Sequence, residues 1–224
     1  MRAIVCKDWG DPETLELGEL PEPALGPGQV RIRMRAAGVN FADCVLVRGQ
    51  YQEKPELPFA PGLEGAGEIM EVGDGVTEFK PGDRVMAVVS TGAYAEQAVC
   101  EATTVFHMPD GMDNATAAAF PVAYGTSHLA LVHRAKLKAG ETVLVLGAGG
   151  GVGLTAVECA KAMGATVIAA ASTPEKLELA RARGADHLIN YTEEDLRGAL
   201  RKITDGNGVD VVYDPVGGEL AQTA

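Results

Sequence analysis

Residues 141–164 read ETVLVLGAGGGVGLTAVECAKAMG, and this stretch decides the fold of the second half of the chain. The apolar run at residues 143–146 is typical of a strand buried on both faces of a sheet. After the glycines, apolar residues recur at helical spacing, namely Val152, Ala156, Cys159, Ala160 and Met163. Gly164 is suited to end that helix. The stretch therefore predicts a strand, a phosphate-binding loop and a helix.

The glycine loop predicts a nucleotide ligand. Glycines let the backbone approach a pyrophosphate closely, and the unpaired N–H groups that open a helix hold its negative charge. The spelling is Gly147-x-x-Gly150-x-x-Gly153 rather than G-x-G-x-x-G. Glycine-rich turns also occur for purely structural reasons. The strand before the loop and the helix after it favour the cofactor interpretation.

The remainder of the second half continues to alternate between strand and helix patterns. Further strands are predicted at residues 166–171, 186–191 and 209–213, with a helix at 175–183 and another opened by Thr192 and Asp195. Alternation of this kind implies a parallel sheet with right-handed crossovers. The predicted fold class of this half is α/β, with a parallel sheet.

The first half reads as short strands broken by Gly and Pro, which suggests a β-barrel. Residues 30–36 alternate strictly, so Arg31, Arg33 and Arg35 are expected on a solvated face. Further strands are expected at residues 63–72, 84–89 and 94–100. A helix capped by Asp113 and a second one from about Tyr124 to Val132 would connect the halves. The predicted domains are residues 1–115 and 116–224.

Composition limits the classes of function. The formal net charge of −12 at pH 7 disfavours general affinity for nucleic acid, and no segment has the length of a membrane span. The first residues contain no apolar run long enough for a signal peptide, so residence in the cytoplasm is expected. The 4 cysteines are scattered and the 4 histidines lack a metal-ligand rhythm. Most of them are expected to serve packing or to lie on the surface.

Residues 38–51 combine a loop and a short helix with unusually placed polar groups, and they form the candidate substrate wall. Asn40, Asp43 and Tyr51 are among these polar groups. Two alternatives stay open here: Asn40 and Asp43 could cap the short helix, and Tyr51 could be a packed loop aromatic.

Several motifs spread over the whole chain carry a family resemblance. They are GVNFAD at 38–43, PFAPGLEGAG at 58–67, GAYAE at 92–96, PVAYGT at 121–126, the glycine loop, GAD at 184–186, INY at 189–191 and DPVGG at 214–218. On these motifs the chain resembles the zinc-independent medium-chain dehydrogenase/reductase superfamily, and within it the NADPH:quinone oxidoreductases of the zeta-crystallin type. The resemblance implies a GroES-like β-barrel domain followed by a Rossmann domain.

The resemblance also implies roles for particular residues. The pyrophosphate would be held by the loop residues Gly149, Gly150, Gly151 and Val152. Thr126 and Asn40 would lie near the nicotinamide, and Asn40 and Tyr51 would meet the substrate carbonyl. The reaction would be reduction of a quinone, or of another double bond conjugated to a carbonyl, by NADPH. The sequence shows no strong general acid, which fits an enzyme that mainly aligns donor and acceptor.

The cofactor is expected to be NADPH rather than NADH. After the second strand, the position about 20 residues beyond the glycine loop holds no Asp or Glu to bind a ribose 2′-hydroxyl. Ser172 could donate to a 2′-phosphate and Lys176 could pair with it, and Tyr191 resembles the third phosphate contact of the family. Alternatively, Ser172 and Glu175 have capping-box spacing and Lys176 is a solvated helix residue.

No metal is expected. Zinc-dependent relatives use a Cys and a Gly-His-Glu triplet as catalytic ligands, and the matching positions here resemble Asn40 and Leu63. The cysteine-rich lobe that holds structural zinc in relatives is also missing.

The resemblance implies a longer chain than this one. Four parallel strands are predicted after residue 140, whereas a complete sheet of this order has six. We therefore expect an incomplete Rossmann domain of low stability, whose last strand leaves an exposed edge, and a homodimer for a chain of full family length. Two other functions stay open: an enoyl or enone reductase, and a non-catalytic chain that binds NADPH or serves as a structural protein.

Overall fold

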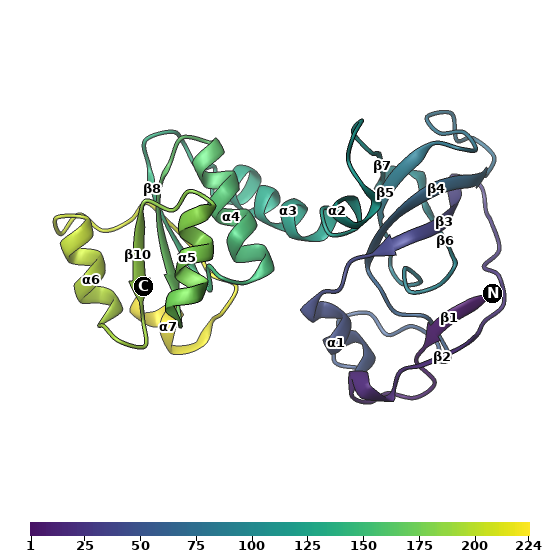
Figure 1. Cartoon of the computed structure of the whole chain (residues 1–224), viewed down its shortest axis with the longest axis horizontal. Coiled ribbons are helices and arrows are strands. Elements are labelled where there is room, and N and C mark those ends of the chain that lie inside the picture. The colour runs from purple at the N-terminus through teal and green to yellow at the C-terminus, as the bar shows by residue number, and fades with distance from the viewer. The chain divides into compact units, whose positions relative to one another are not determined.

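The computed structural model describes residues 1–224, which form two compact units, Met1–Val122 and Ala123–Ala224. Figure 1 shows a β unit at the N-terminus and an α/β unit at the C-terminus. The division falls later than the boundary suggested near residue 115. The boundary suggested near residue 115 falls within helix α2 (Asn114–Ala118). Its Ala117 and Ala118 are buried with Ala66 and Met108, so α2 is part of the β unit.

The β unit is built on an antiparallel sheet of five strands in the order β6-β3-β4-β5-β7. The strands are β3 (Gln29–Ala37), β4 (Glu64–Val72), β5 (Arg84–Val88), β6 (Gln97–Glu101) and β7 (Val105–His107). Strands β1 (Arg2–Val5) and β2 (Glu16–Glu19) form a separate pair, which single bridges at Ala3 and Cys6 join to the rest. Besides α2, three short helices complete the unit, namely η1 (Pro12–Thr14), α1 (Phe41–Val47) and η2 (Ala102–Thr104).

The alternation predicted for β3 holds for its apolar side and fails for one arginine. Val30 and Ile32 are buried in the core of the sheet. The side chain of Arg31 is only 14% exposed, because it donates to the carbonyl of Pro23 at 2.9 Å and pairs with Glu71 at 3.3 Å. Arg33 is exposed and Arg35 pairs with Glu68. The register with β4 shifts between Met34 and Ala36, where β3 itself carries an extra residue, so strict alternation is interrupted at Arg35.

The α/β unit contains four parallel strands in the order β10-β9-β8-β11. They are β8 (Thr142–Leu146), β9 (Thr166–Ala171), β10 (His187–Asn190) and β11 (Val211–Tyr213). The helices are α3 (Pro121–His128), η3 (Leu129–Arg134), α4 (Gly151–Ala162), α5 (Pro174–Ala182), α6 (Leu196–Ile203) and α7 (Gly218–Thr223). None of the helices is both long and apolar enough to cross a membrane.

Both faces of the parallel sheet are covered, as the apolar strand at residues 143–146 predicted. Val143 and Val145 pack with α4 and α5, whereas Leu144 and Leu146 pack with α6. The chain moves from β8 to β10 in one direction and then returns to β11 on the other side of β8. This change of direction between β8 and β11 is the topological switch point of a doubly wound sheet, where ligands bind at the carboxyl ends of the strands. The predicted fold class is confirmed.

Helix α3 continues directly into η3, which is a π-helix rather than an α-helix. Its turn closes with the N–H of Ala135 donating to the carbonyl of Ala130 at 2.8 Å, a span of one residue more than an α turn. Leu131 of η3 is fully buried in the core on the α4 side of the sheet. The sequence pattern predicted the helix but not its wider turn, since apolar spacing does not separate the two over so short a segment.

Candidate functional site

The glycine loop lies at the switch point, between the end of β8 and the start of α4. Gly147 leaves the strand with φ +60, a conformation that favours glycine. Gly153 packs so tightly that a Cβ would lie 2.3 Å from the carbonyl oxygen of Gly147. At Gly151, in contrast, a Cβ would meet nothing within 4 Å. The loop is therefore tightly packed at Gly153 and open to a ligand at Gly151.

The N–H groups of Gly151, Val152 and Gly153 open α4, which begins after its N-cap residue Gly150. The first N–H groups of a helix have no partner within the helix, and they point along its axis towards the space in front of the loop. With the positive end of the helix dipole they favour an anion there. This arrangement fits the pyrophosphate of a dinucleotide.

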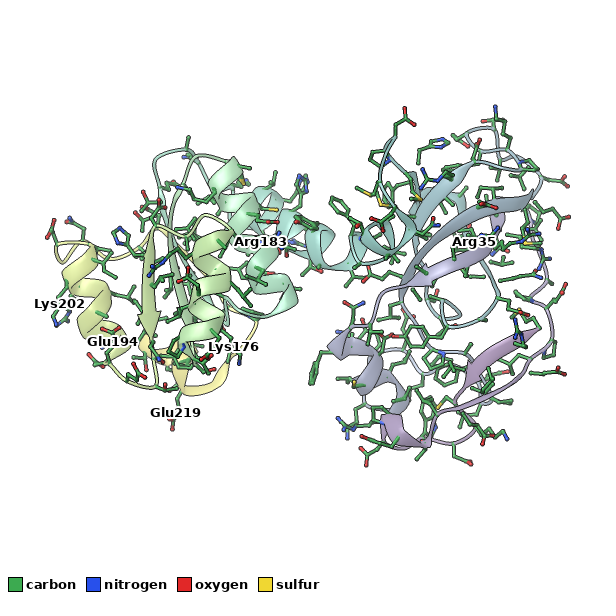
Figure 2. The ribbon with its side chains drawn as sticks, viewed as in Figure 1. Arg35, Lys176, Arg183, Glu194, Lys202 and Glu219 are labelled. Atoms are coloured by element: carbon green, nitrogen blue, oxygen red, sulfur yellow. The ribbon has the colours of Figure 1, made fainter.

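Ser172 and Lys176 meet beside this loop, at the carboxyl end of β9. The Lys176 Nζ donates to the Ser172 Oγ at 3.1 Å. The stem of Lys176 lies against the loop, since a Cβ at Gly149 would come within 2.5 Å of the Lys176 Cβ. Figure 2 labels Lys176 on α5. The Ser172 hydroxyl and the Lys176 ammonium group therefore lie together next to the glycine loop.

The capping alternative for Ser172 does not hold. The N-cap residue of α5 is Thr173, whose Oγ1 accepts from the N–H of Lys176 at 3.4 Å, and Pro174 stands in the first turn. The hydroxyl of Ser172 is therefore not used to cap the helix.

Tyr191 and Thr126 lie at two further positions of the α/β unit. Tyr191 follows β10, is half-buried, and packs against the apolar cluster on the α6 side of the sheet. Its neighbour Thr192 donates from Oγ1 to the carbonyl of Ser172 at 3.1 Å, which fixes the two strand ends next to each other. Thr126 is exposed and lines an open groove of about 400 Å³ together with Val152 and Tyr213.

Sequence reasoning missed a group of buried hydroxyls behind the loop. The Ser127 Oγ is fully buried and lies 2.8 Å from the Thr155 Oγ1 and 3.3 Å from the Tyr213 hydroxyl. It also donates to the carbonyl of Val152 at 2.9 Å. The group links α3, α4 and β11, and burial raises the pKa of Tyr213. Its members are 28 and 86 residues apart in sequence, so no local pattern marks them.

In the β unit, Asn40 is the N-cap residue of α1 and Asp43 stands three residues later. The Asp43 Oδ2 accepts from the backbone N–H of Asn40 at 2.8 Å and from the Tyr94 hydroxyl at 2.9 Å. The capping alternative is thus what the structure shows for this pair. Tyr51 is half-buried and packs against a cluster that includes Leu46 and Phe59.

Glu64 is another residue that sequence reasoning missed, although it lies within a quoted motif. Its side chain is buried, and its Oε1 accepts from the Asn40 Nδ2 at 2.8 Å. Its Oε2 accepts from the backbone N–H of Val122, also at 2.8 Å. Burial raises the pKa of Glu64, and the charge of Asp43 raises it further. The only sequence signal was an acidic residue between glycines at the start of an apolar strand.

The two positions expected to replace zinc ligands are engaged otherwise. Asn40 donates its amide to Glu64, and Leu63 packs against the cluster that contains Phe59. These contacts explain what the side chains do in the fold, and the absence of a metal stays a prediction.

Family models match both units. The model described as alcohol dehydrogenase GroES-like domain matches residues 26–110, and the model described as zinc-binding dehydrogenase matches residues 151–224.

Named relatives match nearly the whole chain. It is 43% identical to quinone oxidoreductase-like protein 2 of Mus musculus, over 98% of this chain and 62% of that protein. It is 42% identical to a quinone oxidoreductase of Pseudomonas aeruginosa, over 96% of this chain and 66% of that protein. The solved Escherichia coli quinone oxidoreductase complexed with NADPH superposes with a TM-score of 0.91 at 35% identity, over 99% of this chain and 68% of that one. The chain spans about three fifths of the length of the first curated relatives it matches, 60% to 62%.

Proposed function

Because the chain belongs to the zinc-independent medium-chain dehydrogenase/reductase family, in its quinone oxidoreductase type, we propose that it binds NADPH and reduces a quinone or a related conjugated carbonyl compound. The observation that carries the proposal is the meeting of Ser172 and Lys176 beside the glycine loop. The 2′-phosphate of NADPH is bound by a cation and a hydroxyl at the end of the second strand, whereas the ribose 2′-hydroxyl of NADH is bound by an acid there.

The residues of the α/β unit fit this cofactor in three places. The N–H groups of Gly151 and Val152 would hold the pyrophosphate, as would the backbone of Gly149 and Gly150. Ser172 and Lys176 would hold the 2′-phosphate, with Tyr191 as the third contact. Thr126 would lie near the nicotinamide, on the groove that it shares with Val152. When bound, NADPH supplies the hydride.

Asn40 and Tyr51 of the β unit are the proposed contacts of the substrate carbonyl. Since the cofactor carries the reactive hydride, the task of these side chains is to orient the acceptor and to donate a hydrogen bond to the oxygen that gains charge. No metal takes part in the proposed reaction. We further propose residence in the cytoplasm, and the resemblance implies a homodimer for a chain of full family length.

The function is tested by measuring NADPH oxidation with a panel of quinones, enones and enoyl thioesters. We expect turnover with quinones or enones. A strong preference for thioesters would contradict the quinone proposal, and binding of NADPH without turnover of any acceptor would indicate a non-catalytic nucleotide-binding chain. Equal affinities for NADPH and NADH, titrated at one ionic strength, would contradict the cofactor assignment. Zinc is measured in the same preparation, and stoichiometric zinc that is lost together with activity on chelation would contradict metal independence.

A further inference from the structure

Two buried carboxylates converge on Asn40. The Asp43 Oδ2 holds its backbone N–H at 2.8 Å, and the Glu64 Oε1 holds its side-chain Nδ2 at 2.8 Å. Asp43 is 5% exposed and Glu64 is 2% exposed. Asn40 itself is only half-buried, so the two acids support a residue that reaches the surface of the unit.

This arrangement is unfavourable for stability alone. A buried carboxylate loses its hydration, and two close to each other repel. The pKa values of both acids are raised, with burial as the largest cause. The backbone also adapts to Glu64, since a Cβ at Gly38 would lie 2.3 Å from the Glu64 Oε1 and 2.7 Å from the carbonyl oxygen of Ala118. An apolar residue at position 64 would avoid the burial of charge, so the acid needs a reason other than packing.

The chemistry of the contacts fixes the orientation of the amide. An ionised carboxylate only accepts hydrogen bonds, so the atom of Asn40 that faces Glu64 must be the nitrogen. The second oxygen of Glu64 is occupied by the N–H of Val122, which likewise needs an acceptor. The oxygen of the Asn40 amide accepts from the backbone N–H of Asp43 in the capping box at the start of α1. One Nδ2 hydrogen is then left for a ligand.

We infer that Glu64 is a positioning residue, which holds the Asn40 amide so that its second Nδ2 hydrogen donates to the carbonyl oxygen of the acceptor substrate. The inference rests on the proposed function and assigns the donor within it. The same carboxylate also holds the backbone N–H of Val122, the last residue of the β unit.

The first test is Glu64→Gln, which keeps the shape of the side chain. Glutamine offers one oxygen and one NH2 group to two N–H donors, so it cannot accept from both Asn40 and Val122. We expect kcat/KM for the acceptor to fall about 10- to 100-fold. The Kd for NADPH should change much less, because the proposed phosphate contacts lie in the other unit and only the nicotinamide would lie near Asn40. The matched control is Glu68→Gln on the same strand, whose side chain is 42% exposed and pairs with Arg35. This control should behave as the unmodified protein.

The second test reverses the polarity of the pair. Asn40→Asp places one carboxylate against another and should lower stability. In the double variant N40D/E64Q the introduced glutamine donates to the introduced carboxylate and still accepts from Val122, so stability should recover towards that of the single variant E64Q. The activity should not recover, because aspartate has no side-chain N–H to donate.

The outcomes separate the inference from the proposed function. Wild-type kcat/KM in E64Q, or recovery of activity together with stability in the double variant, would overturn the inference. If the unmodified protein reduces no acceptor with NADPH, the proposed function fails, and the assignment of a substrate donor fails with it. The stability measurements then still decide whether Glu64 fixes the amide. If N40D does not fold, E64Q and E68Q decide the matter by themselves.

Discussion

The pKa values of Asp43 and Glu64 are raised, whereas those of Glu158 and Asp186, which form ion pairs, are lowered. Burial alone would raise the pKa values of Glu158 and Asp186, but hydrogen bonds, including those from Arg183 and Lys161, lower them. Such acids contribute stability above their unfolded pKa and lose it as the pH falls. Asp43 and Glu64 have raised pKa values instead, so the folded state binds their protons more tightly than the unfolded state. Their contribution to stability is therefore largest at low pH and decreases as the pH rises.

This sign gives a prediction for Glu64→Gln. The ordinary pKa of Glu64 is 4.5, and the folded value lies above it. From pH 4.5 upward to the folded value, the unfolding free energy of the unmodified protein should fall relative to that of E64Q. The fall is about 1.4 kcal/mol for each pH unit that separates the two pKa values. Denaturant titrations at several pH values measure it.

The other groups near Glu64 stay in place in this comparison. Asp43 and the Tyr94 hydroxyl that donates to it are present in both proteins, but the charge of Asp43 raises the pKa of Glu64, so the difference between the two curves includes the interaction of the two acids. The exposed variant E68Q serves as the control. Parallel curves for E64Q and the unmodified protein would show that Glu64 has no raised pKa.

Lys176→Glu tests the cofactor at the residue scale. The substitution removes the cation beside Ser172 and places an acid there. We expect NADPH binding to weaken about 10- to 100-fold, whereas NADH, which lacks the 2′-phosphate, should be much less affected. Fluorescence titration with both cofactors at one ionic strength measures the difference.

Lys202→Glu is the matched control for that experiment. Lys202 is exposed on α6, and Figure 2 shows it well separated from Lys176 within the unit. The control carries the same change of charge and should leave both affinities unchanged. A loss of NADPH affinity as large as that of K176E would mean that net charge, rather than a local contact, determines the binding.

Single residues were predicted from the sequence where a local rule applied. The absence of an acid at the end of the second strand and the presence of Lys176 could be read directly. Glu64 could not be assigned, because its partners Asn40 and Val122 are 24 and 58 residues away in sequence. Arg31 was placed wrongly for a related reason, since the carbonyl of Pro23 that binds it belongs to an irregular segment.

At the scale of elements, two glycines of one loop should respond differently to the same change. Gly151→Ala adds a methyl group in open space, so the unfolding free energy should change by no more than about 0.5 kcal/mol. The methyl group would stand where the pyrophosphate approaches, and we expect NADPH affinity to fall about tenfold or more. Gly153→Ala forces a Cβ to 2.3 Å from the carbonyl oxygen of Gly147 and should cost about 1–3 kcal/mol of stability.

Thermal unfolding and NADPH titration of the two variants check this pair. The expected pattern is a stable protein with weak binding for G151A and a destabilised protein for G153A. Full NADPH affinity in a stable G151A variant would show that the pyrophosphate does not approach the start of α4.

The elements themselves were largely predictable, and the exceptions have physical causes. Apolar runs and turn residues located β8, β9, β10 and β11, because strands buried on both faces leave a strong signal. The start of α5 was less certain, since Ser172 and Thr173 both have the chemistry of an N-cap residue and only the backbone path decides between them. The short strand β7 (Val105–His107) has no pattern of its own and depends on pairing with β5.

At the scale of the whole molecule, each compact unit has its own apolar cores. The cores of the β unit lie within Met1–Val122, and those on the two faces of the parallel sheet lie within Ala123–Ala224. We therefore expect calorimetry to show two unfolding transitions. NADPH at about 100 times its Kd should stabilise the unit with the glycine loop by about 2.7 kcal/mol and should shift that transition. A single transition that moves as a whole with NADPH would contradict this prediction.

The π-helix η3 has a consequence for mutations that change the length of the chain. Since its turn holds one residue more than an α turn, the loss of one codon within residues 129–134 can be absorbed by winding the segment as ordinary α-helix. A second residue lost there would have no wider turn to absorb it, and it would rotate the part of the segment that follows against α3 by about 100°. Ser127 and Leu131 could then no longer both keep their buried positions. A longer in-frame deletion here would therefore either move Leu131 out of the core or separate Ser127 from the Thr155 and Tyr213 hydroxyls that it contacts behind the glycine loop.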